Sequence, residues 1–203
     1  MGLVCYTSQL EPKNVEEALG YESWTTTLQE VLNQLTRNDM WYLVSRPKDK
    51  HVISTNWIFK NKQDENGVIV RNKARLVAQG YSQMEGIDYE ETFTPIFRLE
   101  STRILLAIAC SFRIKLYQMD VNSAFLNGIL SEEVYVEQPK GFEDPKSPNH
   151  VYKLKKALHG LKHAPRAWYE RLTTYLLGKK KFQRGEVDRT LFINRSNNEL
   201  LVV

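Results

Sequence analysis

Apolar residues recur at helical spacing in three parts of the chain, and each part is therefore predicted to be a helix. The first helix covers residues 22–38, where four apolar residues share one face: Trp24, Leu28, Val31 and Leu35. The second covers residues 99–112 and is predicted to be buried, and the third covers residues 165–177. Pro165 suits the first turn of the third helix, and Gly178 suits its C-terminal cap.

Short apolar runs between and after these helices predict strands. The turn sequence Asp-Glu-Asn-Gly at residues 64–67 separates two such runs, 52–62 and 68–78, which indicates a β-hairpin. Four further strands are expected, at residues 41–44, 114–121, 134–137 and 151–154. A closing hairpin is expected from residues 190–194 and 199–203. The predicted fold class is therefore α+β, with a strand–helix–strand core preceded by a β-hairpin lobe.

The composition is that of an ordinary globular protein and excludes several classes of function. Hydrophobic residues make up 42% of the chain and charged residues 26%. No apolar run approaches the roughly 20 residues of a membrane-spanning helix, and the N-terminus does not read as a secretory signal. The two cysteines, Cys5 and Cys110, show no ligand spacing, so no zinc site is predicted. Both are expected to be reduced, which suits an intracellular protein.

Basic residues are concentrated in the C-terminal half of the chain. Of the 28 Lys and Arg residues, eleven lie between Lys146 and Arg184, together with a single acid, Glu170. Aromatic residues are interleaved with this basic block: Tyr152, Trp168, Tyr169, Tyr175 and Phe182. Charge and ring stacking are used together on nucleic acids, so the block is a candidate surface for that partner. A solvated face is the alternative interpretation.

The first candidate for chemistry is Asp120, a carboxylate at the end of a predicted apolar strand. Taken alone, an aspartate in this place is usually a turn or cap residue. The surrounding pattern Asp-x-x-x-Ala-Phe-Leu-x-Gly, however, resembles the first catalytic motif of copia-type reverse transcriptases. Four further segments resemble motifs of this family in the same order: residues 73–81, 89–95, 133–142 and 158–169. The resemblance is specific, because five segments match in order and spacing over most of the chain.

The resemblance implies a right-hand polymerase architecture. Residues 1–40 would form an N-terminal helical segment and residues 41–98 a fingers-like β-hairpin lobe. Residues 99–203 would form an incomplete palm with a ferredoxin-like core.

The resemblance also implies roles for individual residues. Asp120 would be the catalytic carboxylate and a Mg²⁺ ligand, and Val121 would add its backbone carbonyl to the metal site. Asn122, Ala124 and Phe125 would contact the incoming deoxynucleoside triphosphate. Phe125 would crowd a 2′-hydroxyl and so favour deoxynucleotides, with core packing as the alternative for its ring.

Other residues outside the Asp120 segment receive roles from the same resemblance. Lys73 and Arg75 match residues that neutralise the triphosphate, although a solvated strand face is the alternative. His163 stands where the family usually has a glutamine that helps to hold template and nucleotide, and His159 stands in place of a tyrosine. The expected contacts to an RNA template and a DNA primer come from the basic block: Lys153, Lys155, Lys156, Lys162 and Arg166. No membrane partner is expected.

The family's second metal-binding motif, Tyr-Val-Asp-Asp, would follow a run such as Leu200–Val203, at which the given sequence stops. Polymerases use two metal ions about 3.5–4 Å apart, and one carboxylate cannot hold both. The 203-residue chain is therefore expected to be inactive by itself, with a further C-terminal portion of the polyprotein as its missing partner. The alternatives are a module that binds RNA or an RNA–DNA hybrid without catalysis, and a piece of a longer active polyprotein.

Overall fold

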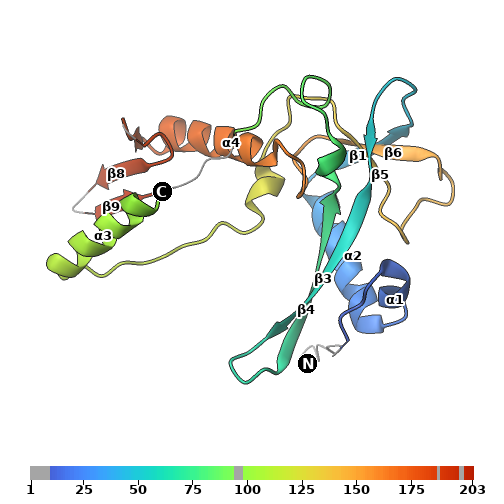
Figure 1. Ribbon diagram of the computed structural model, residues 1–203, viewed down its shortest axis with the longest axis horizontal. Coiled ribbons are helices and arrows are strands. Elements are labelled where there is room, and N and C mark those ends of the chain that lie inside the picture. The colour runs from blue at the N-terminus through green and yellow to red at the C-terminus, as the bar shows by residue number, and fades with distance from the viewer. Residues whose placement is uncertain (1–9, 94–97, 187, 197–198) are drawn as a thin grey trace.

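The computed structural model describes residues 10–93, 98–186, 188–196 and 199–203. Its strands form three separate sheets, which are connected by helices and long loops (Figure 1). The α+β class predicted from the sequence is confirmed. No helix in the described ranges is both long and apolar enough to cross a bilayer.

The first sheet joins strands from distant parts of the chain in the order β1-β6-β5-β2. Its members are β1 (Trp41–Ser45), β6 (His150–Leu154), β5 (Tyr135–Glu137) and β2 (Val52–Ile53). The β1–β6 and β6–β5 pairs are antiparallel, and β2 pairs with β5 in parallel. Strands from the predicted fingers-like lobe and from the predicted palm therefore share one sheet, and the division of the chain at residue 98 stays a prediction.

The second sheet is the predicted β-hairpin, formed by β3 (Thr55–Gln63) and β4 (Ile69–Ala78). The first arm, predicted from residue 52, begins only at Thr55, because Val52–Ile53 form β2 and pair with β5 in the first sheet. Helix α2 (Glu22–Arg37), which follows the short α1 (Val15–Leu19), packs along β4. The Trp24 ring of α2 meets the Phe59 ring of β3 edge to face, with 5.4 Å between centroids. The apolar face predicted for this helix is thus the face that closes the main core.

The third sheet has the order β7-β8-β9 and lies beyond the basic helix α4 (Ala164–Lys179). Its strands are β7 (Gln183–Arg184), β8 (Phe192–Ser196) and β9 (Glu199–Val202). The predicted closing hairpin is confirmed as β8 and β9, although its turn at residues 197–198 lies outside the described residues. The C-terminal cap predicted at Gly178 is wrong, because α4 continues through Lys179 and is capped at Lys180.

Helix α3 (Leu99–Ser111) forms as predicted but is not buried. Leu99, Ile104 and Leu106 are 58%, 59% and 54% exposed, and Ala109 is the one buried residue of the helix. The apolar composition of this helix indicated burial, yet the elements of the described chain do not cover it. The expectation of a buried helix is therefore wrong for this structure.

The strand predicted at residues 114–121 is also absent from the described structure. The segment runs as an extended strap from α3 to the short 3₁₀ helix η2 (Ala124–Asn127), drawn in yellow-green (Figure 1). Tyr117 and Met119 are 76% and 82% exposed. A strand requires a neighbour to pair its N–H and C=O groups, and no described strand lies along this segment. The predicted strand–helix–strand core is consequently not formed here.

Candidate functional site

A cleft of about 560 Å³ lies where four segments of the chain meet: α2, β4, the turn that leads into η2, and the loop before α4. Seven residues singled out from the sequence line it: Lys73, Arg75, Asp120, Val121, Asn122, Ala124 and Phe125. The cleft therefore brings together two motifs that are far apart in the sequence. Its volume lies within the range of about 300–1,000 Å³ that is usual for small-molecule sites.

Strand β4 supplies the cationic wall of the cleft. Alternate residues of a strand share a face, so Lys73 and Arg75 project together with Arg71, while Ala74 between them is buried. Partial burial lowers the pKa of Lys73, and the charges of Arg75, Lys62 and Arg71 lower it further. Crowding of like charges on one strand face favours an anion, because the anion relieves their repulsion.

The turn before η2 supplies the acidic and aromatic groups. Ser123 adopts the left-handed conformation with φ 54° and ψ 39°, which turns the chain sharply between Asp120 and Phe125. Asp120 is exposed at the cleft, whereas the Phe125 ring is half-buried and also packs against the main core. The two interpretations of Phe125, core packing and a cleft contact, are thus compatible with one position.

The loop before α4 places His159 in the cleft by a close interlock with the end of β4. The backbone amide of Ala78 donates to the His159 carbonyl at 2.8 Å. The next residue, Gly160, has φ +91°, and a Cβ atom there would lie 2.2 Å from the Ala78 carbonyl oxygen. The His159 ring meets the Phe125 ring edge to face at 5.9 Å. Burial, followed by the charges of Arg75 and Lys73, lowers the pKa of His159 and favours its neutral form.

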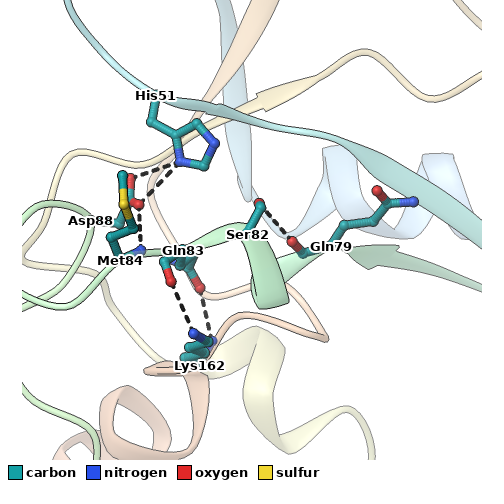
Figure 2. Close-up of polar contacts among 7 residues, drawn as sticks. All are labelled: His51, Gln79, Ser82, Gln83, Met84, Asp88 and Lys162. Atoms are coloured by element: carbon teal, nitrogen blue, oxygen red, sulfur yellow. Dashed lines mark hydrogen bonds and ion pairs between the residues drawn. The ribbon is translucent and has the colours of Figure 1, made fainter.

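A polar network fastens the same loop to the segment after β4 (Figure 2). The Gln83 side-chain oxygen accepts from the Lys162 backbone amide at 2.9 Å, and the Gln83 carbonyl accepts from Lys162 Nζ at 2.9 Å. Asp88 accepts from the Met84 amide at 2.8 Å and lies 3.1 Å from His51 Nδ1. Lys162, predicted to contact nucleic acid, therefore ties two loops together in this structure.

His163 is not among the residues that line the cleft. It precedes α4 as the N-cap residue, is 1% exposed, and its ring stacks on Tyr89 with 6.0 Å between centroids. Burial lowers the pKa of His163, which favours the neutral imidazole. The structure therefore separates this residue from the other nucleotide-site candidates, because it is buried against Tyr89 whereas they line the cleft.

The remaining predicted nucleic-acid contacts lie away from the cleft. Lys153 forms an ion pair with Glu133, and Lys155 forms one with Asp39 at 2.7 Å. Lys156 Nζ donates to a backbone carbonyl at 2.6 Å. These contacts join exposed or half-exposed side chains, and such pairs contribute little to stability.

Arg166 is more firmly held than these lysines. Its side chain is 19% exposed and lies between Glu170 at 3.0 Å and Glu132 at 3.5 Å. The hydrogen bond to Glu170 raises the pKa of Arg166, against the effect of burial. Its charge is largely compensated within the chain.

The carboxylates that line the cleft are Asp120 and Glu30. In the part of the chain that the structure describes, no three His, Cys, Asp or Glu residues gather into a group that could hold a metal ion. The residues present therefore offer Asp120 as one oxygen ligand for Mg²⁺ but do not fit a two-metal site.

Sequence reasoning missed several residues of the cleft. Thr27, Glu30 and Gln34 of α2 line it, as does Arg71. His159, noted in the sequence as a replacement for a tyrosine, lines it as well. The helical spacing places the three α2 residues on one flank, but only the packing of α2 along β4 shows what that flank faces.

Comparison with known proteins agrees with the motifs. Residues 38–203 match the model of the family described as reverse transcriptase (RNA-dependent DNA polymerase). The retrovirus-related Pol polyprotein from transposon RE1 of Arabidopsis thaliana is 43% identical over 94% of this chain and 13% of its own length. That from transposon TNT 1-94 of Nicotiana tabacum is 36% identical over 98% of this chain and 15% of its own length. No solved structure gives a significant match.

The chain thus spans about a seventh of the length of these Pol polyproteins. The family match covers both the β4 cations and the Asp120 turn, which meet at the cleft. The chain belongs to the reverse transcriptase (RNA-dependent DNA polymerase) family and corresponds to a part of a copia-type retrotransposon Pol polyprotein.

Proposed function

We propose that the cleft is the deoxynucleoside triphosphate site of an RNA-directed DNA polymerase domain. The observation that carries the proposal is the meeting of Lys73 and Arg75 with the Asp120 turn in one cleft. A cationic wall and a nearby carboxylate suit a ligand that carries a polyphosphate and an associated divalent cation.

Lys73 and Arg75 would bind the phosphates. An arginine can hold a phosphate through two parallel hydrogen bonds, and a lysine acts as a point charge. Burial is the main cause of the lowered Lys73 pKa, and the repulsion from neighbouring cations that adds to it would be relieved on binding. Asn122 and Ala124 would contact the nucleotide, and the Phe125 ring would crowd a 2′-hydroxyl. His163 is left out of this proposal because it is buried.

Asp120, with the Val121 carbonyl, would provide ligands for Mg²⁺. These are hard oxygen donors of the kind that Mg²⁺ prefers. The described residues offer only part of a two-metal ligand set, so we expect the 203-residue chain to bind nucleotide without joining it to a primer. Extension of a DNA primer on an RNA template, abolished in Asp120→Asn, would contradict this expectation.

In architectural terms, we assign the β3–β4 hairpin to the fingers of a right-hand polymerase and residues 99–203 to its palm. The assignment rests on the motif order and on the cleft between the hairpin and the η2 turn. An RNA template and a DNA primer would be the macromolecular partners of the whole polyprotein.

Equilibrium binding of deoxynucleoside triphosphates to the full 203-residue chain tests the proposal. Lys73→Ala is expected to weaken binding roughly 10- to 100-fold, which corresponds to one hydrogen bond to a charged group. Lys60→Ala is the matched control, because Lys60 pairs opposite Lys73 in the hairpin but does not line the cleft. Equal losses from both variants would show that general charge, and not the cleft, attracts the nucleotide.

The second candidate function is binding of RNA or an RNA–DNA hybrid by the basic block without catalysis. Lys153 and Lys155 favour it, because weak surface ion pairs can exchange a carboxylate for a phosphate. Binding should then fall steeply with salt concentration. A flat salt response, or no binding at low salt, would remove this candidate.

A further inference from the structure

Helix α2 has two faces with different surroundings. Its apolar face holds Trp24 and Leu28, both with no exposed surface, against the core. An adjacent polar flank, made of Thr27, Glu30 and Gln34, lines the cleft. The spacing of three and four residues brings this flank into one line along the helix.

The flank lies outside the part of the chain that the family model matches, which begins at residue 38. The β4 wall carries three cations, whereas Glu30 is the only charged residue of the α2 wall. A carboxylate repels phosphate, so the α2 wall is unsuited to the anionic end of a ligand. Its carboxylate and amide groups are suited to an uncharged part that carries hydrogen-bond donors and acceptors. The Thr27 hydroxyl already donates to the Ser23 carbonyl at 2.8 Å, so it can only accept from a ligand.

The glutamines of α2 differ in the partners they already have. Gln29, outside the cleft, donates from Nε2 to the Asn33 side-chain oxygen at 3.1 Å. Gln34 is exposed at the cleft, and its contact in the described chain is through its backbone carbonyl, which accepts from Asn38. Its amide group therefore remains available to a ligand.

Resting on the proposed nucleotide site, we propose that the α2 flank of Thr27, Glu30 and Gln34 recognises the nucleoside end of the bound deoxynucleoside triphosphate. The two walls then divide the ligand between them. β4 binds the phosphates, and α2 supplies hydrogen bonds to the base and sugar. Gln34 can both donate and accept, whereas Glu30 accepts only, from N–H or hydroxyl groups of the nucleoside.

The test compares two probes on the full 203-residue chain: deoxynucleoside triphosphates and inorganic tripolyphosphate, which lacks the nucleoside. Gln34→Ala is expected to weaken deoxynucleotide binding about fivefold, the ratio that corresponds to one net hydrogen bond, and to leave tripolyphosphate binding within about twofold. Gln29→Ala makes the same chemical change on the same helix outside the cleft and should leave both affinities unchanged. Circular dichroism verifies that both variants keep their helices.

Glu30→Gln provides a second variant. Removing its charge strengthens binding of every anion, including tripolyphosphate, but a contact with the base also changes the affinity ratios among the four deoxynucleotides. Altered ratios support the inference.

The inference is overturned if Glu30→Gln leaves the affinity ratios unchanged and Gln34→Ala leaves deoxynucleotide binding unchanged. The proposed function still stands in that case if Lys73→Ala weakens binding. If neither probe binds the unaltered chain, or if Lys73→Ala binds both probes as tightly as the unaltered chain does, the proposed function is overturned and the inference with it.

Discussion

Replacing Gly160 by alanine is expected to destabilise the chain by more than its backbone conformation alone explains. At φ +91° an alanine costs about 1–2 kcal/mol, because its Cβ is crowded by its own backbone. The added Cβ would also lie 2.2 Å from the Ala78 carbonyl oxygen and 2.5 Å from Val77 Cγ1. Forcing an atom into such a packed place costs about 1–3 kcal/mol more. The expected total is about 2–5 kcal/mol.

Gly67→Ala is the matched control for the conformational part. Gly67 has φ +81° in the hairpin turn, and a Cβ there would meet nothing within 4 Å. Its replacement should therefore cost only the conformational part, about 1–2 kcal/mol. Urea unfolding, followed by the fluorescence of the tryptophans, gives the free energy of unfolding of each variant by linear extrapolation.

The difference between the two variants measures the interlock between the loop before α4 and the end of β4. The packing cost expected at Gly160, about 1–3 kcal/mol, is larger than the uncertainty of about 0.5 kcal/mol in comparing two variants. If the two losses of stability agree within about 0.5 kcal/mol, the close approach of Gly160 to Ala78 is therefore absent in solution. His159 would then lack the anchor that places it in the cleft. A Gly160→Ala chain that is already unfolded without denaturant would agree with the expected loss of stability.

Two further outcomes concern packing and pH. Leu28→Ala should lower the free energy of unfolding in urea by about 2–5 kcal/mol, because Leu28 has no exposed surface. Leu106→Ala in α3 should lower it by less than about 1 kcal/mol, because Leu106 is 54% exposed. Equal losses would show that α3 is covered in solution. His163 has a lowered pKa in the fold, so the stability it contributes is present above the unfolded value of about 6.5 and is lost as the pH falls through the folded pKa. His163→Phe should therefore reduce the acid sensitivity of unfolding, and an unchanged pH profile would count against burial of this ring.

The elements predicted best are those in which local pattern and local packing agree. The β3–β4 hairpin follows from two strand-like runs around Asp64–Gly67, and α2 follows from an apolar stripe that meets the hairpin directly. Both elements satisfy their backbone hydrogen bonds nearby, so a short stretch of sequence contains the information that they need.

The elements predicted worst depend on partners far along the chain. Residues 114–121 have the apolar composition of a strand but no described neighbour to pair with, and α3 has the composition of a buried helix but an exposed face. Composition reports how well a segment suits burial, and only the arrangement of other segments decides whether it is buried.

The sequence by itself determined the family, through motifs whose order and spacing need no three-dimensional information. It also identified Asp120, Lys73 and Arg75 as candidates. The tertiary structure alone decided that these residues share a cleft, that α2 forms one of its walls and that His163 is buried away from it. The reason is physical: a motif records which groups are present, whereas burial and proximity are set by packing between segments distant in the chain.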